Sequence, residues 1–266
     1  MRVGFPNNPR KNILDEIKWI GENGFDFVDL FLEEDMAVPG KIDVDKVKKL
    51  LREYGLGAVG HTAYYLPIGS PIKSLRDAAV FEAVKYLELF NKLGVENVTI
   101  HANWPPGMFS YKEGIKWQLE SLARLSKEAG RYNINLMYEP IDTLQDNAAN
   151  LARILNDIPN LYLTLDLGHT NLFGKNIEEF IKEFHKRLKH VHLHDNDGRR
   201  DLHLPIGTGN INWEKVLKVL KRYYDGTITL EVFSMSIDGA TFPFASWEPS
   251  FFALQKSHFP KSLRGK

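Results

Sequence analysis

The sequence predicts an α/β protein built as a single (β/α)8 barrel. Short apolar runs, rich in β-branched and aromatic residues, alternate with longer amphipathic segments along the 266 residues. This alternation is typical of parallel βαβ units, and about 250 residues is the usual length of such a barrel. A doubly wound dinucleotide-binding sheet is the alternative, but it requires a glycine-rich phosphate turn after the first strand. The sequence at that place reads GFPNNP.

Eight runs are predicted as strands because each is short, apolar and followed by turn residues. They cover residues 2–6, 27–31, 57–61, 97–101, 135–139, 162–166, 190–194 and 227–231. Amphipathic helices are predicted at residues 44–54, 74–93 and 111–131 among others. Asp43 is a typical N-cap residue for the first of these three. Gly55, Gly94 and Gly130 lie where helices are expected to end.

No low-complexity segment or linker interrupts the pattern, so one domain is predicted over residues 1–266. The segment 240–266 is aromatic, and we expect it to supply the last helix and to pack on the barrel.

Composition excludes several kinds of protein. The formal net charge is zero, so the chain as a whole lacks the basic character of a nucleic-acid-binding protein. It has no cysteine, which excludes disulfides, thiolate metal sites and cysteine nucleophiles. No apolar run approaches the roughly 18 residues that span a bilayer, and the first residues lack the apolar core of a signal peptide. A cytoplasmic location is therefore predicted.

Residues suited to metal binding or acid–base chemistry end five of the predicted strands. These residues are His61, His101, Glu139, Asp166 and Glu231. Because the strands of a parallel barrel all open onto one face, which carries the active site, we expect these side chains to converge there.

The seventh strand carries alternating histidines, His190, His192 and His194. Alternate side chains point to the same side of a strand, so all three are expected to face the barrel interior. His192 is predicted as a metal ligand, and His190 as a buried histidine in a lower layer of the barrel.

Two loops add further candidates. His169 follows Asp166 in the motif DLGH, and Asp201 and His203 are two residues apart, so both could reach one ion. The set Glu139, Asp166, His192 and Glu231 is rich in oxygen and suits Mn, Mg, Co or Zn. Further possible ligands shift the prediction toward zinc and toward more than one ion. They are His61, His101, His169, Asp201 and His203.

At these residues the chain resembles the xylose isomerase-like TIM barrel superfamily. That group includes sugar and sugar-phosphate isomerases and epimerases, and also endonuclease IV. The motifs that carry the resemblance are HTAYYLPIG, YEP, DLGH, HVHLHD, DLHLPIGTGNINW and TITLE.

Resemblance to the epimerase branch implies one metal ion, held by Glu139, Asp166, His192 and Glu231. The two glutamates would then exchange protons with a substrate carbon, and His169 would hydrogen-bond the substrate or bind a second ion. Tyr64 and Trp104 could wall the sugar pocket. This branch usually has an arginine six residues past the strand-seven histidine. This chain has Gly198 there, and either of the next two residues, Arg199 or Arg200, could replace it.

Resemblance to the endonuclease IV branch implies a phosphodiesterase with up to three zinc ions. All nine of its ligand positions are matched, by His61, His101, Glu139, Asp166, His169, His192, Asp201, His203 and Glu231. However, where that branch carries an arginine-bearing loop that enters DNA, this chain has Glu33, Glu34 and Asp35, which would repel phosphates.

The principal hypothesis is therefore a divalent-metal-dependent isomerase or epimerase of a small sugar, sugar phosphate or polyol-derived ketose. The alternative is a zinc phosphodiesterase that cleaves abasic-site DNA, and a third is a metal-free binding protein on a barrel scaffold. A metal content of about three zinc ions per chain would favour the nuclease, and one ion the isomerase. The expected partner is a small carbohydrate, with nucleic acid as the alternative substrate; barrels of this group often pair, so a homodimer is a further possibility.

Overall fold

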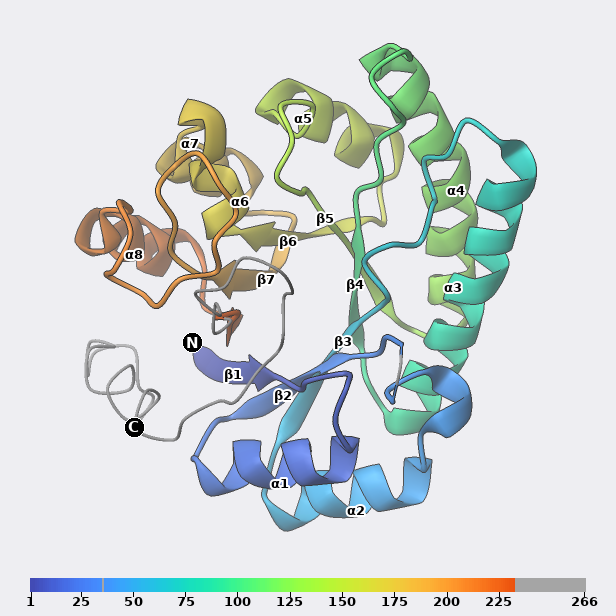
Figure 1. Cartoon of the computed structure of the whole chain (residues 1–266), viewed down its shortest axis with the longest axis vertical. Coiled ribbons are helices and arrows are strands. Elements are labelled where there is room, and N and C mark those ends of the chain that lie inside the picture. Colours follow the sequence, from blue (N-terminus) through green and yellow to red (C-terminus); the bar gives the residue numbers. More distant parts are fainter. Residues whose placement is uncertain (35, 233–266) are drawn as a thin grey trace.

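The computed structural model describes residues 1–34 and 36–232. Within them, eight parallel strands form a closed barrel in sequence order, because β1 pairs with both β2 and β8 (Figure 1). The predicted (β/α)8 fold is thereby confirmed. The strands are β1 (Arg2–Pro6), β2 (Phe27–Phe31), β3 (Gly57–His61), β4 (Asn97–His101), β5 (Asn135–Glu139), β6 (Tyr162–Asp166), β7 (Leu188–Leu193) and β8 (Thr227–Leu230).

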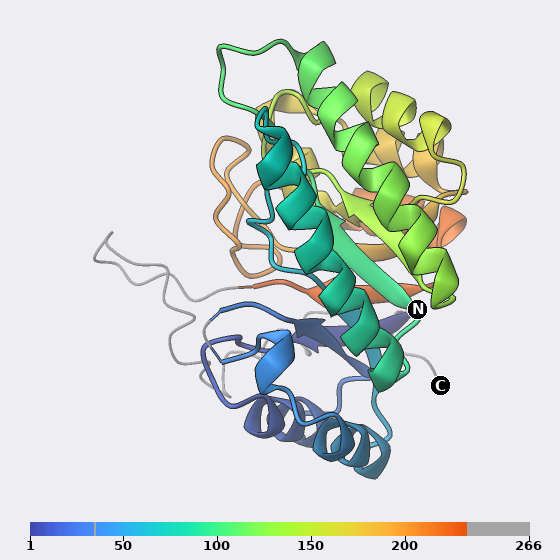
Figure 2. The same ribbon diagram turned by 90° about the vertical axis from the view of Figure 1, so that its right-hand side faces the viewer.

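Helices surround the strands, and within the described residues each of the first seven strands is followed by at least one. The long helices α3 and α4 lie side by side on one flank of the barrel (Figure 2). The helices are α1 (Ile13–Glu22), α2 (Val44–Glu53), α3 (Lys73–Leu93), α4 (Tyr111–Arg131), α5 (Ala148–Asp157), α6 (Leu167–Asn171), α7 (Ile177–Phe184) and α8 (Trp213–Tyr223), with 3-10 turns η1 (Pro39–Lys41) and η2 (Leu172–Gly174).

Local sequence explains where helices begin and end. The Asp43 side chain accepts a hydrogen bond from the backbone N–H of Lys46 and caps α2, as predicted. Gly94 ends α3 in the left-handed conformation, with φ of 80°. The predicted range 111–131 matches α4, although Gly130 lies in its last turn and the left-handed residue after the helix is Asn133.

The side chains that fill the barrel interior are apolar in one half of the barrel and polar in the other. Phe27, Val59 and Met137 form an apolar cluster of their own. Side chains two residues further along a strand point to the same side, so Asp29 and Glu139 share the interior with Phe27 and Met137, respectively. Both carboxylates are fully buried. The polar half of the interior is therefore the half nearest the C-terminal strand ends, where chemistry was predicted.

The last two strands differ slightly from the predicted ranges. β7 begins two residues earlier than predicted and ends at Leu193, so His194 follows the strand. β8 ends at Leu230, although the backbone N–H of Glu231 still donates to the carbonyl of Leu193. The predicted aromatic segment 240–266 lies outside the described residues. In the part of the chain that is described, no helix has the length and apolar character needed to cross a membrane.

Candidate metal centre

Four side chains from neighbouring strand ends form the first group. Glu139, Asp166, His192 and Glu231 each offer a ligand atom within 4.8 Å of the others. Nδ1 of His192 lies 3.0 Å from Oε1 of Glu139 and 2.9 Å from Oε2 of Glu231. Ladder register explains the convergence, because Asp166 is paired with His192 across β6 and β7.

This group has the properties of a cation site. Oδ2 of Asp166 is buried and accepts no hydrogen bond from the described residues, and the buried Oε2 of Glu231 has an ion-pair contact with His192 but no hydrogen bond. Such oxygens cost free energy unless another partner satisfies them. Burial acts to raise the pKa of Glu139, but His192 and His101 hold that pKa well below its ordinary value. Burial likewise acts to lower the pKa of His192, while Glu139 and Glu231 hold it well above the usual range. These residues fit a divalent ion, which would replace the proton on His192.

A second group adjoins the first through Glu139. Its Oε2 atom lies 3.3 Å from Nε2 of His61 and 3.1 Å from Nε2 of His101, whereas Oε1 faces His192. Nδ1 of His61 donates to the carbonyl of Thr62, so its Nε2 is left to bind a ligand. The two oxygens of Glu139 therefore face different groups, and either group would use Glu139 as a ligand if it held an ion.

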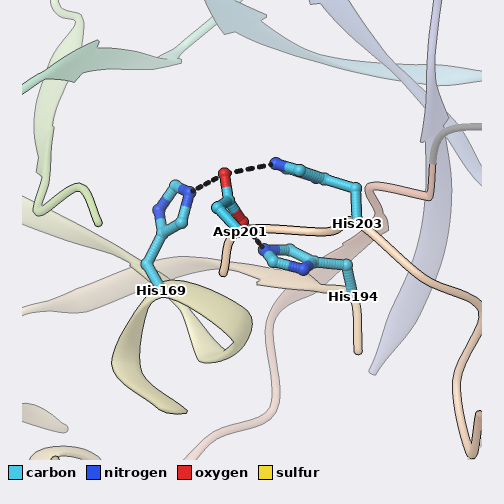
Figure 3. A group of neighbouring side chains, drawn as sticks. All are labelled: His169, His194, Asp201 and His203. Carbon is cyan, nitrogen blue, oxygen red and sulfur yellow. Dashed lines mark hydrogen bonds and ion pairs between the residues drawn. The ribbon is translucent and has the colours of Figure 1, made fainter. Parts of the chain in front are cut away.

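A third group lies beside the first and contains His169, His194, Asp201 and His203 (Figure 3). The Asp201 carboxylate lies 3.4 Å from Nε2 of His169, 3.5 Å from Nε2 of His194 and 3.0 Å from Nε2 of His203. Burial acts to lower the pKa of His203, but Asp201 raises it to about 9. Sequence analysis predicted three members of this group and omitted His194.

Asp29 is a further site residue that sequence analysis missed. Its Oδ2 atom accepts hydrogen bonds from Nε2 of His190, Nε2 of His192 and Oγ1 of Thr229, at 3.1, 3.2 and 2.8 Å. With Nε2 of His192 donating to Asp29, Nδ1 is left for the first group. His190 is fully buried in the layer below, as predicted. The one available clue was an aspartate among apolar residues in the strand FVDLF.

Replacing Asp29 by Asn is expected to weaken metal binding at the first group by about 10–100-fold, because partners that orient a ligating histidine have effects of this size. The amide keeps the shape of the side chain but not the charge that fixes the His192 ring. Titration of the metal-stripped protein with zinc measures the affinity. An unchanged affinity in the Asn variant would show that Asp29 does not orient His192.

The three predicted substrate-binding residues lie in different settings. Tyr64 is exposed, and its ring centroid is 6.1 Å from that of His101. Trp104 is half-buried and donates from Nε1 to Oδ2 of Asp146 at 2.9 Å. Arg199 is exposed on the loop between β7 and α8, where its backbone N–H donates to Asp197. None of the three belongs to a ligand group among the described residues, and their roles stay predictions.

Asp146, the partner of Trp104, gives a prediction about pH. Burial raises its pKa to about 6 despite hydrogen bonds from Thr143 and Trp104, against about 3.9 in an unfolded chain. The folded protein thus holds this proton more tightly, and wild-type stability falls as pH rises from about 4 to about 6. Replacing Asp146 by Asn removes this loss, so the variant should gain about 2–3 kcal/mol relative to wild type across that window.

Urea unfolding at pH values of about 4.5 and 7.5, with chelator present, measures this difference. If the difference in unfolding free energy between wild type and Asp146→Asn does not change with pH, Asp146 does not retain its proton in the folded protein.

Comparison with known proteins identifies the family. Residues 17–251 match the family model described as xylose isomerase-like TIM barrel. An uncharacterized protein of Methanocaldococcus jannaschii is 28% identical over 242 residues, which cover 83% of this chain and 79% of that protein. The L-ribulose 3-epimerase of Methylomonas sp. is 27% identical over 229 residues, covering 80% and 76%.

Two further similarities point to both branches of the family. The probable endonuclease 4 of Aquifex aeolicus is 25% identical over 243 residues, covering 82% of this chain and 86% of that protein. A solved structure described as a D-tagatose 3-epimerase-like protein superposes with a TM-score of 0.85 at 26% identity, covering 99% and 97%. With the matched model spanning most of its length, the chain belongs to the xylose isomerase-like TIM barrel family.

Proposed function

We propose that the protein is a divalent-metal-dependent isomerase or epimerase of a small sugar, sugar phosphate or polyol-derived ketose. Glu139, Asp166, His192 and Glu231 would hold the ion. The observation that carries the proposal is that two glutamates from β5 and the end of β8 approach the same atom, Nδ1 of His192, at 3.0 and 2.9 Å. Similarity to the L-ribulose and D-tagatose 3-epimerase-like proteins supports a ketose as the substrate.

In this reaction the chain supplies two carboxylates to one substrate carbon. One glutamate removes the proton from the carbon beside the carbonyl, and the other returns a proton to the opposite face. A bound divalent ion supplies polarisation of the neighbouring carbonyl and hydroxyl oxygens. The burial of both glutamates keeps water away from them. Asp29 maintains the orientation of His192.

His169 was predicted either to hydrogen-bond the substrate or to bind a second ion. Its Nδ1 atom lies 4.0 Å from the carboxylates of Glu139 and Asp166, and its Nε2 atom faces Asp201. The second role accounts better for this orientation.

Deuterium incorporation tests the proposal. The wild-type protein, loaded in turn with Mn, Co, Mg and Zn, is incubated with D-tagatose, D-allulose or L-ribulose in heavy water. We expect deuterium at carbon 3 of at least one ketose, and loss of incorporation when the metal is stripped. Failure to exchange with any of these ketoses or their phosphates would reject the epimerase proposal.

A zinc phosphodiesterase is the second candidate, because a specific observation favours it. Three ligand groups adjoin one another, and Glu139 belongs to two of them, as a centre with up to three zinc ions requires. The acidic segment after β2 opposes DNA less strongly than its sequence suggested. Glu33 is buried, and burial raises its pKa to about 6, whereas Glu34 is exposed. Asp35 lies outside the described residues.

Incision of an abasic-site duplex by the zinc-loaded protein is the direct assay for this candidate. A metal count alone separates the two functions less well than the sequence suggested, because the third group could hold an ion in either enzyme. Incision without ketose exchange would establish the nuclease, and exchange without incision the epimerase.

A further inference from the structure

We infer that His194 joins His169, Asp201 and His203 in a closed, four-ligand zinc site that fixes the loop between β7 and α8. This site adjoins the first group but shares no residue with it, and the inference holds whichever reaction the first group performs. Neither the sequence pattern nor the comparisons assign His194 a role.

The donor atoms of the four residues lie close enough together to hold one zinc ion. Bonds of about 2.0–2.1 Å from zinc to its ligands place ligand atoms about 3.3 Å apart at tetrahedral angles. Oδ2 of Asp201 lies 3.0 and 3.4 Å from Nε2 of His203 and His169, whereas Oδ1 lies 3.5 Å from Nε2 of His194. One ligand atom from each of the four residues lies within 4.8 Å of the others. Figure 3 shows the three imidazole rings disposed around this carboxylate.

Every histidine of the group has its other ring nitrogen directed at a backbone carbonyl. Nδ1 of His169 donates to Pro140, Nδ1 of His194 to Asp195 and Nδ1 of His203 to Glu231, at 3.3, 3.4 and 2.9 Å. A carbonyl can only accept, so it fixes the tautomer and leaves Nε2 as the metal-binding atom. All three Nε2 atoms are thereby left unprotonated and available to bind the same ion.

Two buried atoms of the group have no hydrogen-bond partner among the described residues. They are Nε2 of His194, which has an ion-pair contact of 3.0 Å with Oδ1 of Asp166 but no hydrogen bond, and Oδ1 of Asp201. His194 is fully buried, so water does not compensate it. An unsatisfied buried polar atom costs about 1–3 kcal/mol, and an ion bound to both atoms would remove that cost.

The surrounding chain is shaped to receive His194. A Cβ atom added to Gly168 would collide with the His194 ring, so this position in α6 requires glycine. The rings of His194 and His203 stack with centroids 3.9 Å apart. Asp195 and Leu204 exchange two backbone hydrogen bonds of 2.8 Å, which bring Asp201 and His203 back over the strand end.

Four protein ligands define the role of the site. A zinc ion that takes all four has no position for water or substrate, which is the property of structural sites. The site would fix the loop that carries Asp201 and Arg199 above the first group. A simpler explanation for His194 is an ion pair, because its Nε2 lies 3.0 Å from Oδ1 of Asp166.

Cobalt titration distinguishes the two explanations. The stripped protein is titrated with Co2+, whose tetrahedral complexes have intense visible bands, and zinc affinity is measured by competition. In the His194→Asn variant the bands at this site should weaken as water enters, and zinc affinity should fall at least tenfold. His185→Asn, outside the barrel, should behave as wild type. Glu231→Gln, which changes a side chain of the first group but keeps the backbone carbonyl that His203 contacts, should retain these bands.

Two additional measurements test the inference even if the His194→Asn variant does not fold. Gly168→Ala keeps the histidine but displaces its ring, and should reproduce the loss seen in His194→Asn. In cadmium-loaded wild type with isotope-labelled histidine, scalar coupling should connect the metal to Nε2 of His169, His194 and His203. Coupling to His169 and His203 alone, or an unchanged cobalt spectrum in His194→Asn, would overturn the inference in favour of the Asp166 ion pair.

Discussion

Replacing Glu139 by Gln is expected to reduce proton exchange at the substrate carbon by about 10²–10⁴-fold, the scale of a lost acid–base group. Gln has nearly the same shape but cannot take up a proton. Its carbonyl oxygen would also be a poorer metal ligand than the carboxylate, whose two oxygens face His192 on one side and His61 and His101 on the other. Deuterium incorporation into the ketose substrate measures the loss.

Metal content must be measured on the same variant, at metal concentrations high enough to restore occupancy. Glu53→Gln, on the exposed side of α2, is the matched control and should keep wild-type exchange. Retained exchange in Glu139→Gln would exclude Glu139 as the proton-transferring group.

Replacing His192 by Ala is expected to destabilise the metal-free protein by about 3–5 kcal/mol, the cost of removing one partner of a buried charge pair. His192 lies between three buried carboxylates, those of Asp29, Glu139 and Glu231, at 2.9–3.2 Å. In its absence these carboxylates would face one another without the cation that now separates them.

The loss of folding stability in the His192→Ala variant should depend on pH in a defined direction. The pKa of His192 is raised, so its protonated form stabilises the fold fully below the unfolded pKa of about 6.5 and loses this effect only as pH rises through the folded value. Urea unfolding in chelator measures the difference, with His185→Ala as a surface control expected within about 0.5 kcal/mol of wild type. A deficit below about 1 kcal/mol at neutral pH would contradict the buried charge cluster.

The strand ends could be predicted from sequence because two simple geometric rules act together. Side chains alternate along a strand, and parallel strands exit on one face of the barrel. His61, His101, Glu139 and Asp166 each end a strand as predicted. The ladder then brings His101 beside Glu139.

Asp29 could not be assigned because its partners are remote in sequence. His190 and His192 are 161 and 163 residues away, and Thr229 is 200 residues away. The pattern of β2 indicates that an aspartate is buried, but only barrel closure reveals what neutralises it. Its partners depend on the register of β7 and β8 against the interior of β2.

His194 was expected to face the interior, yet its partners depend on a loop. Asp201 and His203 reach it because the chain reverses after Asp195 and pairs with it again at Leu204. His203 has a positive φ of 45°, which is uncommon for a residue other than glycine. No short-range pattern predicts such a conformation, so the sequence indicated His169, Asp201 and His203 as ligands but not that His194 joins them.

An anomalous-scattering map of crystals grown from the purified protein tests the central claim most directly. The account predicts a peak enclosed by Glu139, Asp166, His192 and Glu231, with ligand atoms at about 2.0–2.2 Å if the ion is zinc. Crystals soaked in excess Zn, Mn and Co that showed no density between these four side chains would contradict it.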